Sequence, residues 1–149
     1  MNYYHGTKSQ ITEFNQKGSG KHGEGYYFTP DYNEACYFAK SLYGNGENKG
    51  PRVYTVKLKA FNLFNSMSLE DAKSVALKFG LIYREPKNAG GPKEHYHYLA
   101  KQLKSIGIIN TNEAISQAGY DGILYDLMQH VIVFDSKQVE ILAEEILDL

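Results

Sequence analysis

Segments typical of β-strands lie at both ends of this chain, and segments typical of helices lie between them. Residues 52–59 alternate apolar and polar side chains with period two, which is the clearest strand pattern in the sequence. Further strands are predicted over residues 2–5, 25–29, 122–125, 131–134 and 139–142. Because strands and helices do not alternate one by one, this order predicts an α+β fold rather than a series of βαβ units.

Four helices are predicted from their start signals and from apolar side chains at helical spacing. The first covers residues 32–43, where Asp31 is the N-cap and Glu34 completes a capping box. The other three helices occupy residues 68–80, 94–106 and 111–118. Residues 8–24 are polar and rich in glycine, which predicts a loop, and the acidic and apolar tail 143–149 is assigned to a short helix.

The composition is that of an ordinary folded domain. The 149 residues suffice for one hydrophobic core, and no long linker divides them, so a single domain over residues 1–149 is expected. The net charge of −1 creates no global field that would attract nucleic acid or an acidic membrane. The single Cys36 and an N-terminus without signal-peptide features favour the cytoplasm, including a host cytoplasm if a phage or a secretion system delivers the protein.

Two short clusters contain residues that a core strand does not need. The first cluster ends a predicted strand in His5, Gly6 and Thr7, which present an imidazole, a bare backbone and a hydroxyl group. The second cluster, Gly25 to Thr29, offers flat aromatic faces. Together these groups suit a planar ligand that carries an amide and is joined to a ribose.

The chain resembles the ADP-ribosyltransferase superfamily, and in particular small bacterial and phage domains similar to the catalytic core of poly(ADP-ribose) polymerases. The matching segments occur in the family's order, at residues 4–7, 25–29 with Tyr37, 118–123 and 131–139. The resemblance implies a split pair of antiparallel β-sheets, with a helical insertion at about residues 66–118. It also implies NAD as the co-substrate.

The roles of individual residues are implied by the same resemblance. His5 would hydrogen-bond a ribose hydroxyl, and the backbone of Gly6 would contact the nicotinamide carboxamide, where a missing Cβ permits close approach. Tyr27 and Tyr37 would enclose the cationic nicotinamide ring, with a cation–π contribution of about 0.5–2 kcal/mol. Two hydroxyl side chains are implied as contacts of the phosphates or the ribose: Thr7 and Thr29.

The family often has a glutamate directly before its closing strand, where this chain has His130. The catalytic residues implied are therefore His5, Tyr27 and His130. A neutral imidazole accepts a hydrogen bond from the ribose, whereas a protonated one repels the cationic centre, so activity is expected to fall as the pH drops through the His130 pKa. Asp126 is the nearest carboxylate in the sequence. The missing glutamate argues against chain elongation and favours mono-transfer, a different chemistry or a loss of activity.

These features predict an NAD-dependent mono-ADP-ribosyltransferase that releases nicotinamide and modifies a macromolecule, with a protein preferred to a nucleic acid as acceptor. A bacterial or phage toxin or effector is the expected setting, without a membrane partner. Three alternatives stay open: an NAD glycohydrolase, an RNA 2′-phosphotransferase-like enzyme, and a non-catalytic module that binds NAD, ADP-ribose or a protein. Against the phosphotransferase, Arg52 and Arg84 are the only arginines available for a phosphate. The oligomeric state stays open.

Two further patterns are interpreted as non-functional in themselves. His95 and His97 lie two residues apart in a predicted helix and so on different faces, unlike the i, i+4 pair of a zinc-binding helix. No metal site is therefore expected. The glycine-rich stretch 18–25 is not followed by the Lys-Ser or Lys-Thr pair of a P-loop, and it is interpreted as a mobile edge of the nucleotide cleft.

Overall fold

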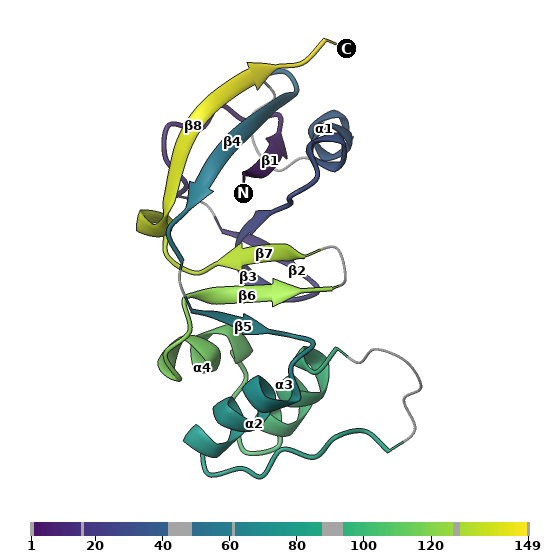
Figure 1. Ribbon diagram of the computed structural model, residues 1–149, viewed down its shortest axis with the longest axis vertical. Coiled ribbons are helices and arrows are strands. Elements are labelled where there is room, and N and C mark those ends of the chain that lie inside the picture. The colour runs from purple at the N-terminus through teal and green to yellow at the C-terminus, as the bar shows by residue number, and fades with distance from the viewer. Residues whose placement is uncertain are drawn as a thin grey trace.

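The computed structural model describes residues 2–15, 17–41, 49–60, 62–87, 94–126 and 129–148. Residues 42–43 of the first predicted helix and residues 88–93 of the predicted insertion lie outside the described residues. The described elements form two β-sheets that follow one another along the long axis of the molecule, with three helices at the far end of the second sheet (Figure 1). The fold is α+β, as predicted.

The first sheet has three antiparallel strands in the order β1 (Tyr3–Thr7), β4 (Arg52–Leu58) and β8 (Val139–Ile146). The second has five strands in the order β2 (Gly18–Gly20), β3 (Gly23–Phe28), β7 (His130–Val133), β6 (Gly122–Tyr125) and β5 (Leu63–Asn65). The β5–β6 pair is parallel, which differs from the antiparallel arrangement implied by the resemblance. A long helical connection separates these two strands, and parallel pairing requires such a crossover.

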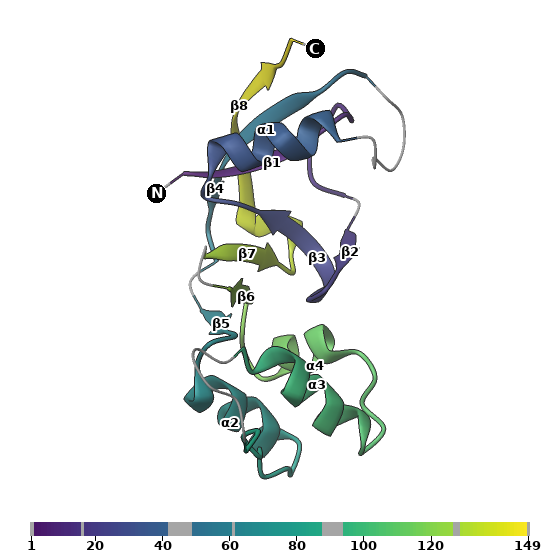
Figure 2. The same ribbon diagram turned by 90° about the vertical axis from the view of Figure 1, so that its right-hand side faces the viewer.

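Helix α1 (Tyr32–Lys40) lies across β1, as Figure 2 shows. The remaining helices follow one another between β5 and β6: α2 (Leu69–Lys78), α3 (Tyr96–Lys104) and α4 (Thr111–Gln117). A 3-10 turn, Ser136–Gln138, precedes β8. The helices therefore occupy the position expected of the insertion, while the assignment of the whole chain to a single domain stays a prediction. Within the part of the chain that the structure describes, no helix has the length and apolar character needed to span a membrane.

Strand β7 contributes to two separate hydrophobic cores. Its Val131 and Val133 pack with Phe28 and other residues between the two sheets. Ile132 points to the opposite face and packs into the core that the three inserted helices build on β5 and β6. Because side chains alternate along a strand, one continuous apolar run serves both cores, which explains why this segment lacks a polar face.

Two expectations about secondary structure were wrong. The segment assigned to a loop contains β2, which pairs with β3 in the register Gly18↔Gly25, because glycines here leave room for the Tyr27 ring across the hairpin. The tail assigned to a short helix is strand, since β8 continues to Ile146 and pairs with Arg52 of β4. Cross-strand pairing in the folded domain overrides the helical character of this tail.

The two sheets are joined where β1 meets the end of β3. The Tyr4 and Thr29 backbones exchange hydrogen bonds of 2.8 and 3.0 Å. Two residues after Tyr4, Gly6 lies under α1 so closely that a Cβ atom there would be 1.8 Å from the Ala35 carbonyl oxygen. The absence of a side chain at Gly6 is therefore needed for helix α1 to close over β1, quite apart from any ligand.

This close approach predicts the effect of a single methyl group. Gly6→Ala is expected to destabilise the domain by about 3 kcal/mol, because the clash involves backbone atoms and only a shift of α1 relieves it. Urea denaturation of the wild type, Gly6→Ala and Gly50→Ala measures the effect. Gly50→Ala is the control, because a Cβ at Gly50 meets nothing within 4 Å, although its φ of +92° adds strain. A loss for Gly6→Ala no larger than the loss for Gly50→Ala would contradict the contact with α1 as the source of a large cost.

Candidate active site

A cleft of about 730 Å³ opens where the two sheets meet α1. Its lining includes six of the residues singled out in the sequence: His5, Gly6, Tyr27, Thr29, Tyr37 and His130. Thr7 lies outside this lining, and its hydroxyl oxygen accepts a hydrogen bond of 3.1 Å from the Ser9 backbone instead. The β1–β3 junction and the first residue of β7 thus bring together side chains that are far apart in the sequence.

The His5 ring has a defined orientation and protonation. Its Nδ1 atom lies 2.9 Å from the carbonyl oxygen of Tyr27. Because a carbonyl can only accept, Nδ1 carries the proton. Burial lowers the pKa of His5 and outweighs the opposing effect of this hydrogen bond, so the ring is neutral. Nε2 is consequently the nitrogen with the lone pair, which suits it to accept a hydrogen bond from a hydroxyl group.

The Tyr27 ring lies across the side-chain-free face of β2. Its carbon atoms are 3.5 Å from a Cβ built on Gly18 and 3.3 Å from one built on Gly20, and its hydroxyl donates to the Gly23 carbonyl oxygen. Burial raises the pKa of Tyr27, which keeps the phenol neutral. Tyr37, by contrast, is 73% exposed on α1. The two rings line the same cleft, one held by the sheet and one free to be covered by a ligand.

His130 is held between two carboxylates. Its Nδ1 atom lies 2.7 Å from Oδ2 of Asp126, and its Nε2 atom contacts Oε1 of Glu34. Carboxylates only accept, so both ring nitrogens donate and the ring is an imidazolium. Burial lowers the pKa of His130, but the hydrogen bonds and charges of the two carboxylates outweigh burial and the net shift is upward. This differs from the neutral imidazole, accepting a ribose hydroxyl, that the sequence led us to expect.

The two carboxylates that hold His130 also line the cleft. Glu34 was interpreted as part of a capping box, but the Asp31 backbone nitrogen bonds to Thr29 Oγ1 at 3.1 Å, and the Glu34 side chain is directed to His130. Asp31 itself caps α1, as expected. Asp126 has a φ of +54°, an uncommon backbone conformation for a residue other than glycine, in the turn before β7. Two carboxylates and one imidazolium leave this cluster with a net negative charge.

Tyr125 connects this cluster with the β2–β3 turn. Its ring stacks on His130, with centroids 5.3 Å apart, and on His22, with centroids 4.1 Å apart. It also meets Tyr27 edge to face at 6.2 Å. Burial raises the pKa of Tyr125, which keeps it neutral. The sequence analysis missed this residue, because a tyrosine in a predicted strand is indistinguishable from core packing.

Two β-sheets that meet at β1 and the end of β3, with a cleft lined by histidines and tyrosines at that junction, define a domain of the ADP-ribosyltransferase type, in agreement with the sequence resemblance. A family model described as "ADP-Ribosyltransferase in polyvalent proteins" matches residues 1–146. The chain therefore belongs to this family of ADP-ribosyltransferases. No curated protein and no solved structure matches the chain significantly.

Proposed function

We propose that this chain uses NAD to transfer a single ADP-ribose group to a macromolecule, most suitably a protein, with release of nicotinamide. The observation that carries this proposal is the convergence, in one cleft, of the neutral His5, the sheet-bound Tyr27 and the negatively charged cluster around His130. Membership of the ADP-ribosyltransferase family supports the type of reaction.

The proposed binding of NAD follows from the orientation of each group. His5 accepts a hydrogen bond from a ribose hydroxyl at Nε2, because its Nδ1 is committed to the Tyr27 carbonyl oxygen. The nicotinamide ring stacks on Tyr27, and the exposed Tyr37 covers its other face. The backbone of Gly6 contacts the carboxamide. Thr29 is a structural hydroxyl in this arrangement, since its Oγ1 accepts from the Asp31 backbone.

The proposed chemistry breaks the bond between the nicotinamide nitrogen and C1′ of the ribose. The bonding electrons leave with nicotinamide, which becomes neutral, and positive charge develops on the ribose. Glu34 and Asp126 stabilise this charge, because preorganised charges act strongly on charge that develops in a transition state. An oxygen or nitrogen atom of the acceptor then bonds to C1′, and the proton it loses passes to one of these carboxylates. His130 acts as a positioning residue that holds both.

The structure also bears on the three alternative functions that the sequence left open. A non-catalytic module drew its support from the missing glutamate, but Glu34 supplies a carboxylate from another part of the chain. An RNA phosphotransferase needs cationic side chains at the phosphate; Arg52 is buried, pairs with Glu144 at 3.5 Å and lies outside the cleft lining. A glycohydrolase differs only in using water as the acceptor.

Incubation with NAD labelled in the adenylate part, together with bacterial lysate, tests the proposed function. Labelled protein together with free nicotinamide is the expected result, and loss of the label after nuclease but not after protease digestion would redirect the acceptor to nucleic acid. Release of free ADP-ribose without labelling would indicate a glycohydrolase. Folded protein that releases no nicotinamide with any lysate would contradict the proposal.

The His130 imidazolium, which lies between two carboxylates, makes the stability of the domain depend on pH. The pKa of His130 is raised in the fold, so its contribution is complete below the ordinary value of about 6.5 and is lost as the pH rises through the higher folded pKa. The melting temperature of wild type minus that of His130→Gln is therefore expected to be larger at about pH 6 than at about pH 9. A difference that grows with pH would contradict a protonated His130.

A further inference from the structure

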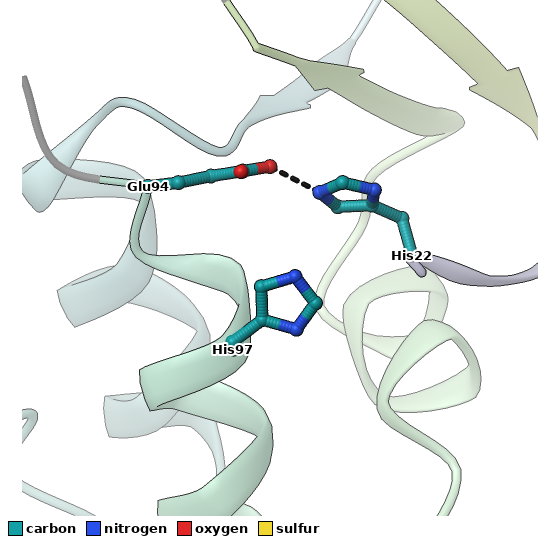
Figure 3. A group of neighbouring side chains, drawn as sticks. All are labelled: His22, Glu94 and His97. Atoms are coloured by element: carbon teal, nitrogen blue, oxygen red, sulfur yellow. Dashed lines mark hydrogen bonds and ion pairs between the residues drawn. The ribbon is translucent and has the colours of Figure 1, made fainter. Parts of the chain in front are cut away.

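Outside the cleft, three side chains with metal-binding atoms meet between the β2–β3 turn and the start of α3. They are His22, Glu94 and His97, and their candidate ligand atoms all lie within 4.8 Å of one another. Figure 3 shows the three side chains pointing toward a common centre from two separate parts of the chain. His22 is 5% exposed, whereas His97 is on the surface, so the group is open to solvent on one side.

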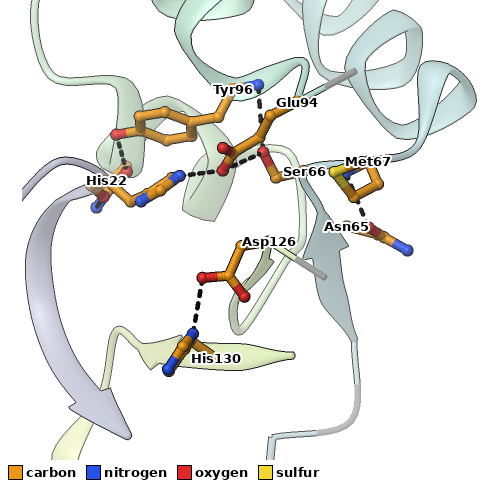
Figure 4. Close-up of polar contacts among 9 residues, drawn as sticks. His22, Asn65, Ser66, Met67, Glu94, Tyr96, Asp126 and His130 are labelled. Carbon is orange, nitrogen blue, oxygen red and sulfur yellow. Dashed lines mark hydrogen bonds and ion pairs between the residues drawn. The ribbon is translucent and has the colours of Figure 1, made fainter. Parts of the chain in front are cut away.

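Neighbouring polar side chains hold His22 and Glu94 in place. Oε1 of Glu94 contacts Nε2 of His22 and accepts a hydrogen bond of 3.0 Å from the fully buried Ser66 hydroxyl (Figure 4). The backbone carbonyl of His22 accepts 2.7 Å from the Asn112 amide, and Tyr96 donates 2.6 Å to the same amide group. Outer contacts of this kind orient ligands in metal sites.

We propose that His22, Glu94 and His97 bind one divalent transition-metal ion, zinc in preference, which ties the β2–β3 turn to the start of α3. Two imidazoles and one carboxylate form the protein ligand set of several zinc sites, with solvent in the fourth position. Imidazole nitrogen also disfavours magnesium and calcium, which prefer oxygen ligands. Because a carboxylate only accepts, Nε2 of His22 carries a proton in its contact with Glu94, and that proton is lost when the nitrogen coordinates the ion.

The ion requires only small movements of these side chains. Ligands at about 2.1 Å from a tetrahedral zinc ion lie about 3.4 Å from one another. Glu94 would rotate away from direct contact with His22, and the exposed His97 would close onto the ion. The entry side is the solvent-facing side of His97, which also leaves the fourth coordination position accessible.

Metal binding at this point would fix an edge of the cleft. Gly18 and Gly20 of β2 line the cleft, and the turn that carries His22 follows directly after them. The His22 ring stacks on Tyr125, which stacks in turn on His130. The glycine-rich segment that was interpreted as a mobile edge would be tied down by the ion.

The structure also explains why the sequence analysis led us to expect no metal. His95 and His97 were considered together, and the structure separates them, since His95 Nδ1 is 2.8 Å from the Tyr83 hydroxyl. The partners of His97 are His22, from a hairpin turn far away in sequence, and Glu94. Spacing along one helix gives no indication of such a site.

Isothermal titration of tag-free, chelator-treated protein with zinc chloride tests the proposal, and the visible spectrum of the cobalt-substituted protein reports the coordination. One equivalent of zinc is expected, with at least about tenfold weaker binding in His97→Ala and in Glu94→Gln. Both side chains are at least partly exposed, so these variants avoid the core disturbance that a change at the buried His22 would cause. Glu70→Gln, an exposed position on α2, is the matched control and is expected to bind like the wild type.

Zinc-free protein that takes up no stoichiometric zinc would overturn the proposal. So would equal binding in the wild type and both ligand variants, because that result assigns the ion to other surface groups. Magnesium is expected to produce no heat at the same concentrations. The readout is binding alone, so failure here leaves the proposed transferase activity untouched, and failure of that activity leaves the metal site standing.

Discussion

Replacing His5 by asparagine is expected to slow nicotinamide release from NAD at least about a hundredfold while the domain stays folded. The asparagine amide nitrogen lies close to the position of the imidazole Nδ1 and keeps the hydrogen bond to the Tyr27 carbonyl oxygen. No atom replaces Nε2, so the ribose loses the acceptor that orients it for cleavage. The rate of nicotinamide release at saturating NAD measures the effect.

Two comparisons make this experiment specific. His5→Gln places an amide group near the position of Nε2 and gives up the bond of Nδ1, so it is expected to retain more activity than His5→Asn. Thermal melting shows whether either change damages the packing of His5 against Phe14, where the ring centroids are 5.1 Å apart. A folded His5→Asn with the turnover of the wild type would remove His5 from the site.

The second large effect is expected from Glu34→Gln. Glutamine still accepts a hydrogen bond from His130, but it lacks the negative charge that would stabilise the positive charge developing on the ribose. Nicotinamide release is expected to fall about 10²- to 10³-fold, while the dissociation constant of NAD changes much less, because the interaction is strongest in the transition state. Single-turnover kinetics and a separate binding titration distinguish the two quantities.

Asp126→Asn is the informative companion to this variant. If Asp126 carries the main electrostatic effect, its substitution slows the reaction more than Glu34→Gln does. Glu13→Gln, at an exposed position away from the cleft lining, controls for the loss of one negative charge from the molecule. An unchanged rate in Glu34→Gln and in Asp126→Asn alike would rule out the proposed role of the cluster around His130.

The general fold could be predicted from the sequence because its strongest signals are local. The alternation along β4 and the caps Asp31 and Ser68 act within a few residues, and the structure has the strand and both helices. The strand β2 was missed because the contact that accounts for its glycines comes from another strand. Its glycines are needed by the Tyr27 ring, which lies across them from the neighbouring strand.

The candidate site divides in the same way. His5, Gly6 and Tyr27 belong to short motifs, and the structure places all three at the cleft. The Glu34 carboxylate could not be identified, because its partner His130 is 96 residues away and its position fitted a helix cap equally well. The sequence resemblance implies only a ligand role for Gly6, whereas the structure adds its contact with α1. Long-range proximity, rather than residue type, is the missing information in each case.

The four residues of β7 have a wider consequence for the molecule. Neighbouring positions of this strand face opposite compartments, and its first residue is the clamped His130. Any rearrangement of the inserted helices that moves Ile132 therefore shifts the pleat on which the imidazolium rests. If the cleft binds NAD as proposed, a contact that displaces the inserted helices would therefore alter the proposed reaction through this strand, without touching the cleft itself.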